Sequence, residues 1–153
     1  MKMTITKTAL PIPIVILHLE GTLDGSNFNK LIEKAQTLFA NGARDLILDL
    51  TNLAFISSSG LGALHQVALL FKGKNHTERD ESWASYRWAT YRNIKRDHDL
   101  RRQEHVKLLS PSKEVREVLD MVGFDALFEI YSDMPQALNS FREPASLDQP
   151  GMR

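Results

Sequence analysis

The stretch LDLTNLAFISSSGLG, residues 48–62, decides the fold. Residues 46–50 form a nearly continuous apolar run, which is typical of a strand buried between two layers. Residues 51–56 are expected to form a connection that carries its own hydrophobic anchors. At residues 57–60, three serines and a glycine, a helical pattern begins whose apolar positions recur at intervals of three and four as far as Phe71. A buried strand that leads into a helix predicts one unit of an α/β fold.

The same alternation of strand and helix extends to both sides of this stretch. The β-branched run 14–20, closed by Gly21, predicts a strand, and the alternating residues 3–6 predict a partner strand for it. The further predicted elements are a helix at 28–39, a strand at 106–109, a helix that opens at 110–114 and ends at Gly123, a strand at 127–131 and a helix at 134–141. Because parallel neighbours need helical crossovers, this order predicts a single α/β domain with a mainly parallel sheet of four to five strands and about four helices.

Residues 73–104 differ in character from the rest and are expected to be an insertion after the second helix. They hold many charges and both tryptophans, Trp83 and Trp88, but show no clear period. Tryptophan and arginine are favoured in interfaces, so the segment predicts either a contact with a partner or an excursion that folds back on the domain. The domain is thus expected to span residues 1–141, with a flexible tail at 142–153.

The overall composition narrows the classes of function. Lysine plus arginine equals aspartate plus glutamate, 19 each, so no global field draws the chain to nucleic acid, and no direct nucleic-acid partner is expected. The absence of cysteine excludes disulfide frameworks, thiolate nucleophiles and cysteine-zinc sites. Neither a signal peptide nor an apolar run long enough to span a bilayer is visible, so we expect a cytoplasmic protein without a transmembrane segment. The oligomeric state stays open.

Two predicted loops follow strands at the same edge of the sheet. In open α/β sheets, functional loops gather at the carboxyl ends of the strands. Residues 21–27 follow one predicted strand, and residues 51–60 follow the other. We therefore expect the functional surface where these two loops meet.

The residues of the two loops resemble the STAS domain family. Residues 21–24, Gly-Thr-Leu-Asp, follow a hydrophobic strand. Residues 48–62 are similar to the family's signature, which is aspartate-leucine-serine/threonine, a short hydrophobic loop, and then aspartate-serine-serine/threonine-glycine-leucine. The stretch 108–128 resembles the family's closing half, and the resemblance as a whole covers roughly residues 3–72 and 105–141. The best-known members of this family are bacterial anti-sigma factor antagonists.

The resemblance implies a protein-binding regulator that is switched by phosphorylation. The family's phosphorylated serine directly follows its aspartate, which corresponds to Ser58, and Ser57 stands where the family has the aspartate. Unphosphorylated, the domain would bind an anti-sigma factor that is also a serine kinase of the GHKL ATPase type. Phosphorylation by that kinase would abolish binding, and a phosphatase would restore it. Nucleotide and magnesium belong to the kinase, so no cofactor is expected here. The implied partner-binding residues are Asp24, Gly25, Ser57, Ser58, Ser59, Gly60 and Leu61.

Elementary chemistry allows two interpretations of the three serines. A helix N-terminus has backbone N–H groups without intrahelical partners and a positive dipole end, so a phosphate on Ser58 would be stabilised there. Serine is also an ordinary N-cap residue, which stabilises a helix by about 1 kcal/mol without further function. Ser57 and Ser59 are chemically capable acceptors as well. Asp24 either orients the loop for a partner or simply forms the turn before the first helix.

Other classes of function stay open at this point. A STAS module that acts without a sigma factor, in a sensory assembly or a lipid-transport complex, is compatible with the insertion and with a serine at position 57. A receiver domain phosphorylated on Asp49 would need an acidic pair after the first strand and a lysine after a later one, and neither is evident.

No enzyme is expected, and no catalytic or metal-binding residue is predicted. Residues 110–113 match the Ser-x-x-Lys spacing of penicillin-recognising enzymes, but the other motifs of those enzymes are missing, so a helix start capped by Ser110 or Ser112 is favoured. A Gly-x-Ser-x-Gly elbow and a phosphate-binding glycine loop are absent, and the five histidines show no metal-ligand pairing. His65 is expected to be a partly exposed helix residue.

Overall fold

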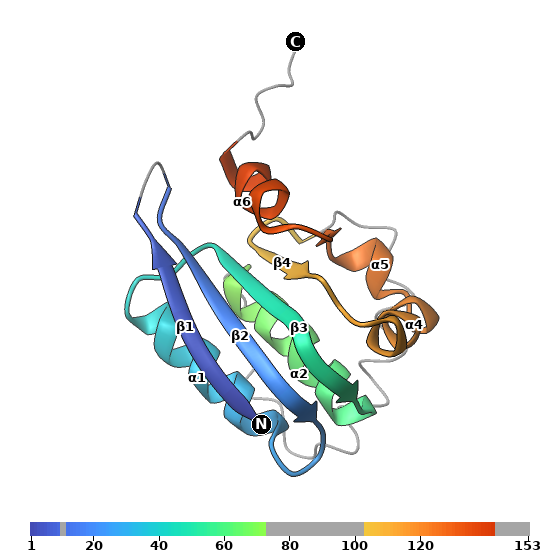
Figure 1. Ribbon diagram of the computed structural model, residues 1–153. Coiled ribbons are helices and arrows are strands. Elements are labelled where there is room, and N and C mark those ends of the chain that lie inside the picture. Colours follow the sequence, from blue (N-terminus) through green and yellow to red (C-terminus); the bar gives the residue numbers. More distant parts are fainter. Residues whose placement is uncertain (10–11, 73–102, 143–153) are drawn as a thin grey trace.

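The computed structural model describes residues 1–9, 12–72 and 103–142 of the 153-residue chain. One five-stranded sheet forms the centre, with strand order β1-β2-β3-β4-β5 (Figure 1). The β1–β2 pair is antiparallel and the other three pairs are parallel, as predicted for a mainly parallel sheet. The elements in chain order are β1 (Lys2–Thr8), β2 (Ile14–Leu23), α1 (Phe28–Ala40), β3 (Leu46–Ile56), α2 (Ser58–Phe71), β4 (Val106–Leu109), α4 (Lys113–Met121), α5 (Phe124–Leu127), β5 (Ile130–Tyr131) and α6 (Met134–Arg142).

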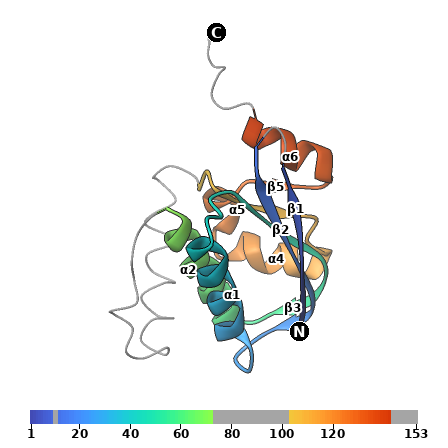
Figure 2. The same ribbon diagram turned by 90° about the vertical axis from the view of Figure 1, so that its left-hand side faces the viewer.

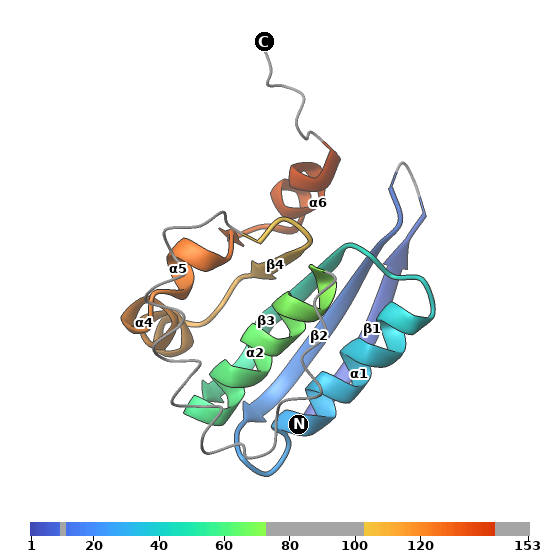
Figure 3. The same cartoon turned by 180° about the vertical axis from the view of Figure 1, so that it is seen from behind.

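The main core lies between the sheet and the layer that holds α1, α2 and α4 (Figures 2 and 3). Alternate strand residues such as Leu17 and Leu48 point into this core and are fully buried, because side chains of a strand alternate between its two faces. Val115 and Leu119 of α4 and Phe124 of α5 close the core. Burial of this apolar surface supplies most of the stability that holds the loops in place.

The opposite face of the sheet is covered at one end only. Helix α6 packs over β4 and β5, where Ala137 and Phe141 bury Ile47 and Leu109. The buried Lys107 lies under this helix, with its Nζ 2.8 Å from Glu129 Oε1 and 4.8 Å from the ring centre of Phe141. A buried lysine is tolerated when its charge is paired, as it is here. Ile14 and Ile16 of β2 belong to the same small cluster as Ile47. Beyond this cluster the face is polar and partly open to solvent, and it carries Thr4, Thr6, His18, Asp49 and Thr51.

Strands β2 and β3 are longer than predicted. Gly21 does not close β2, which continues to Leu23, and residues 51–56 are the second half of β3 rather than a connection. The sequence hides this because the register between the strands shifts near Gly21, which has a φ of +106°. Leu53 and Ile56 still reach the core beyond the exposed Thr51 and Asn52. The two predicted loops therefore shrink to residues 24–27 and to Ser57.

The predicted strand at 127–131 is also wrong for most of its length. Residues Phe124–Leu127 form the short helix α5, and β5 is only Ile130–Tyr131. Gly123, with a φ of +85°, lies between α4 and α5, so Leu127, the first residue of the predicted strand, belongs to a helical turn instead. The described residues thus contain five helices, against about four predicted.

The predicted insertion and tail lie mostly outside the described residues. Residues 73–102 and 143–153 are not described, so their predicted roles stay predictions. Gln103, which the sequence assigns to the insertion, is buried, and its side-chain amide donates to the Ala68 carbonyl at 2.8 Å. Within the described ranges, none of the helices has the length and the apolar character needed to cross a bilayer.

Candidate functional site

The site lies where β2 and β3 end side by side. Leu23 and Ile56, the last residues of the two strands, are paired in the parallel register. One step further, the Ser57 backbone N–H donates to the Leu23 carbonyl at 2.9 Å. The connection to α1 and the start of α2 are therefore joined directly through the backbone. Figure 1 shows both connections at the carboxyl ends of the strands.

The turn before α1 is held by its own side chains. The Asp24 carboxylate accepts hydrogen bonds from the Ser26 hydroxyl at 2.7 Å, from the Ser26 backbone N–H at 2.9 Å and from the Thr22 hydroxyl at 3.3 Å. These donors hold the pKa of Asp24 below its usual range. Asn27 closes the turn: its side-chain carbonyl accepts from the Asp24 N–H, and its amide donates to the Thr22 carbonyl, both at 3.0 Å. Asp24 is thus an ionised turn former at neutral pH.

Helix α2 begins with a serine cap against the ends of the strands. The Ser57 hydroxyl accepts from the Gly60 N–H at 3.2 Å, which makes Ser57 the N-cap, and Ser58 is the first helical residue. A Cβ atom at Gly60 would lie 2.8 Å from the Leu23 carbonyl oxygen and 2.8 Å from Ile56 Cγ1. Only glycine lets the first turn approach the strands this closely.

Ser58 presents a free hydroxyl to solvent. Its side chain is exposed, whereas Ser57 and Ser59 are half-buried. Among the described residues the Ser58 hydroxyl has no hydrogen-bond partner, and the first turn of α2 contains no acidic residue. Within α2 itself, no acidic side chain compensates the positive end of the helix dipole beside this accessible hydroxyl.

The structure brings the predicted site residues together. A Cβ at Gly25 would lie 3.8 Å from Ser59 Oγ, so the Asp24 turn touches the start of α2. We call the group Asp24, Gly25, Ser57, Ser58 and Ser59 the serine loop surface. Gly60 and Leu61, which were predicted to bind a partner, are buried. They can shape this surface from beneath but offer a partner little area.

Two comparisons with known proteins, with a family model and with solved structures, fit this geometry. Residues 5–75 match the family model described as the STAS domain, and this range contains both strands, both loops and the serine cap. Over residues 5–75 the chain is similar to the STAS domain family. Solved structures extend the likeness: a Thermotoga maritima protein described as an anti-sigma factor antagonist has a TM-score of 0.63 at 17% identity, covering 90% of this chain and 94% of that one. No curated protein sequence matches the chain.

Two further structures share the fold. An anti-sigma factor antagonist from Mycobacterium paratuberculosis has a TM-score of 0.60 at 16% identity, and the match covers 92% of this chain and 95% of that chain. The anti-sigma factor antagonist SpoIIAA in its unphosphorylated form has a TM-score of 0.55 at 18% identity, covering 94% and 100% of the two chains. At such identities the likeness establishes the fold and leaves activity to be argued from the site.

Sequence reasoning missed Phe55 of the STAS-like domain. It was expected to be one of the hydrophobic anchors of a connection, but its side chain is 52% exposed. Phe55 pairs in register with Thr22, and Thr22 in turn donates to Asp24. Strand alternation could have found it: Ile56 points into the core, so its neighbour must point outward. An exposed aromatic thus lies beside the serine loop surface.

Asp49 of the STAS-like domain serves the sheet. Its carboxylate accepts from the Thr51 hydroxyl at 2.6 Å and lies 2.7 Å from His18 Nδ1, and His18 Nε2 lies 2.9 Å from the Thr6 hydroxyl. Burial raises the pKa of Asp49, but the hydrogen bonds from Thr51 and His18 outweigh it and leave the pKa below its usual range. β3 runs on past Asp49 to Ile56, so Asp49 is not at the strand end where a receiver aspartate would be needed.

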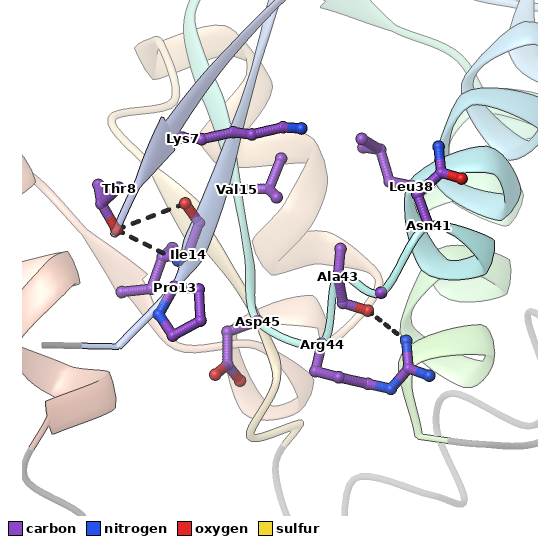
Figure 4. A pocket seen from close by; sticks show the side chains of 11 residues that line it. Lys7, Thr8, Pro13, Ile14, Val15, Leu38, Asn41, Ala43, Arg44 and Asp45 are labelled. Atoms are coloured by element: carbon purple, nitrogen blue, oxygen red, sulfur yellow. Dashed lines mark hydrogen bonds between the residues drawn. The ribbon is translucent and has the colours of Figure 1, made fainter. Parts of the chain in front are cut away.

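A hollow of about 290 Å³ lies at the other end of the STAS-like domain (Figure 4). It is bounded by the start of β2, the end of α1 and the start of β3, and the Lys7 side chain extends across it toward Leu38 and Asn41. It contains none of the serine loop residues. In the described parts of the chain, no three His, Cys, Asp or Glu residues gather as a metal site would require. His65, expected to be partly exposed, is buried in α2.

Proposed function

We propose that this STAS-like domain is an anti-sigma factor antagonist whose binding to a cognate anti-sigma factor is switched by phosphorylation of Ser58. The observation that carries the proposal is the exposed Ser58 hydroxyl at the first position of a buried helix. The fold shared with anti-sigma factor antagonists supports it, and so does the placement of the Asp24 turn against the same helix start.

A phosphate on Ser58 would change the surface and spare the fold. The group would add about −1.5 to −2 charges at a helix N-terminus, where backbone N–H groups and the dipole favour an anion. The Ser58 side chain is exposed and takes no part in the cap, which is made by Ser57. The core beneath therefore need not rearrange, and the effect falls on any partner that covers the helix start.

Phe55 supports a docking role for this surface. An aromatic side chain that is 52% exposed leaves apolar area in water, and aromatic residues are common hot spots of protein interfaces. Phe55 pairs in register with Thr22, which donates to Asp24, so we propose that the partner which covers the Asp24 turn and Ser58 also buries Phe55. The proposed partner thus has an apolar socket for Phe55 and no strong anion over Ser58.

Ser57 in place of the family's aspartate is compatible with this proposal. Serine and aspartate are both good N-cap residues, and Ser57 makes the cap to Gly60. The replacement removes one negative charge beside Ser58 and leaves the geometry of the helix start intact. We infer that the cognate kinase tolerates a neutral residue at this position.

The first test is phosphorylation by purified anti-sigma factor kinases from the same organism, with ATP and magnesium, followed by mass spectrometry. We expect phosphate on the wild type and on Ser59→Ala, and none on Ser58→Ala. Equal phosphate on wild type and Ser58→Ala would contradict the site assignment.

The second test is affinity for the same kinases by calorimetry. Ser58→Asp should bind at least about tenfold more weakly, which corresponds to about 1.4 kcal/mol. Ser112→Asp, which adds a carboxylate at the capped start of α4, is the matched control and should bind like the wild type. If Ser58→Asp binds the kinases as tightly as the wild type, the proposed phosphorylation switch is wrong. If no kinase binds the wild type, a STAS module in a sensory assembly or a lipid-transport complex becomes the better assignment.

A further inference from the structure

Strand β1 forms one edge of the sheet. The order β1-β2-β3-β4-β5 places it beside β2 alone, and among the described residues no strand pairs with its other side (Figure 1). It is regular over all seven residues from Lys2 to Thr8. An exposed, regular edge of this length offers a row of backbone donors and acceptors to another strand.

The three central residues of β1 are symmetrical about Ile5. Ile5 is the middle residue, and it is flanked by Thr4 and Thr6. Ile5 is also one of only three large hydrophobic residues that are exposed in the described parts of the chain, with 39% of its surface open to solvent. A seven-residue edge with an exposed β-branched residue at its centre is suited to pairing with a copy of itself.

We propose that the chain forms a two-fold dimer in which β1 pairs antiparallel with β1 of a second copy, centred on Ile5. Ile5 then lies opposite Ile5 of the second copy, and Thr4 lies opposite Thr6. All seven residues of β1 take part, and residues that lie opposite share a face, so the helix layers of both copies stay on the same side. Two five-stranded sheets become one continuous sheet. The dimer does not depend on the function proposed for Ser58.

The two lysines of β1 are compatible with this register and disfavour two of the alternatives. Lysine on an edge strand usually discourages pairing. In the register centred on Ile5, Lys2 lies opposite Thr8 and Lys7 lies opposite Met3, so no like charges meet. A parallel pairing in register would place each lysine opposite itself. An antiparallel pairing shifted by one residue toward the N-terminus would place Lys2 opposite Lys7, whereas the shift the other way would leave fewer residues of β1 paired. Like charges directly opposite destabilise a strand pair.

The first experiment is sedimentation of the full chain over a range of concentrations. We expect a species of twice the 17.4 kDa chain mass, and Ile5→Lys should raise its dissociation constant at least about tenfold. Met121→Lys is the matched control, because Met121 is a more exposed apolar residue, 72% open, on helix α4 and away from the edge. A wild type that stays monomeric at every concentration would overturn the proposal, as would equal dissociation constants for the two variants.

The second experiment tests the register with introduced cysteines. Because the chain has no cysteine of its own, any disulfide must come from the introduced residues. Under mild oxidation Ile5→Cys should form a disulfide-linked dimer, since opposite residues of paired strands bring their Cβ atoms to about 5 Å. Thr4→Cys alone should remain largely unlinked, but mixed with Thr6→Cys it should link to it. Efficient linking of Thr4→Cys alone, or no more linking of Ile5→Cys than of Met121→Cys, would contradict the pairing.

Discussion

Helices α2 and α4 begin with the same cap, and the two starts differ only after it. Ser57 accepts from the Gly60 N–H at 3.2 Å, and Ser112 accepts from the Val115 N–H at 3.2 Å. Both capping serines have extended backbone, with ψ of 177° and 166°. After the cap α4 continues with a lysine and with Glu114, whereas α2 continues with two serines and has no acidic residue in its first turn.

The difference teaches that a serine cap by itself does not mark a functional site. At α4 the side chain of Glu114 already supplies negative charge to the positive end of the helix. At α2 that charge is missing, and the exposed Ser58 is in the position to receive it as a phosphate. The capped start of α4 therefore already has a negative charge, whereas the capped start of α2 would gain one only by phosphorylation of Ser58.

The largest effect expected at these helix starts is that of Gly60→Ala. The third helical position holds a valine in α4 but must be glycine in α2, because an added Cβ would lie 2.8 Å from the Leu23 carbonyl oxygen. Overpacking of this kind lowers the free energy of unfolding by up to about 3 kcal/mol, and the better helix propensity of alanine raises it by about 1 kcal/mol. We expect a net loss of about 2 kcal/mol in the free energy of unfolding, measured by urea denaturation.

Gly25→Ala is the control for that measurement. An added Cβ at Gly25 meets only Ser59 Oγ, at 3.8 Å, so the stability should change by less than about 0.5 kcal/mol. We attribute the need for glycine at position 60 to the close strand ends and not to the flexibility of a glycine backbone. Equal losses of unfolding free energy for Gly60→Ala and Gly25→Ala would contradict this.

A smaller effect is expected from removing either cap. Ser57→Ala and Ser112→Ala each delete one hydrogen bond to a backbone N–H, and each should cost about 1 kcal/mol of unfolding free energy. Matching losses in urea denaturation would show that the two caps are alike and that the starts differ only in the residues that follow. A loss confined to Ser57→Ala would instead mean that this serine supports more than a helix cap.

The smallest effect concerns the Asp24 carboxylate, which belongs to the turn that touches the start of α2. Ser26→Ala removes the shortest hydrogen bond to the Asp24 carboxylate, so the lowered pKa of Asp24 should rise toward its ordinary value in a carbon-detected NMR titration. A lowered pKa stabilises the fold above the unfolded pKa of about 3.9, and this contribution disappears as the pH falls through the folded value. The variant should therefore lose less stability in acid than the wild type. Asp49 serves as the internal reference, since its pKa should not move.

Local pattern was sufficient for much of the fold. The apolar run at 46–50 and the helical spacing at 28–39 predicted β3 and α1, because these elements bury one continuous face. Ser110 or Ser112 was predicted to cap a helix, and Ser112 does, since capping depends only on residues three positions apart. The grouping of the Asp24 turn with the three serines followed from topology, as carboxyl ends of parallel strands share an edge.

The missed features depend on partners that are distant in sequence. The continuation of β3 to Ile56 needs β2 as a partner, and the buried position of Gln103 needs the Ala68 carbonyl. The pairing of His18 with Asp49 spans 31 residues, and no spacing rule connects them. The error at 127–131 has another cause. A short apolar run suits a strand and a helical turn equally, and here the run is divided between the end of α5 and β5.

The antiparallel edge has a consequence for how many signals one assembly can carry. Two copies joined through β1 would direct their Ser58 residues toward opposite ends of the joined sheet, because β1 of one copy runs against β1 of the other. A single partner molecule would then reach one serine and not its counterpart. Each assembly would have none, one or two phosphates, and the half-modified form would still hold one partner. The number of partner molecules held by such a pair would fall from two to one to none as the kinase acts. A single copy either binds its partner or does not.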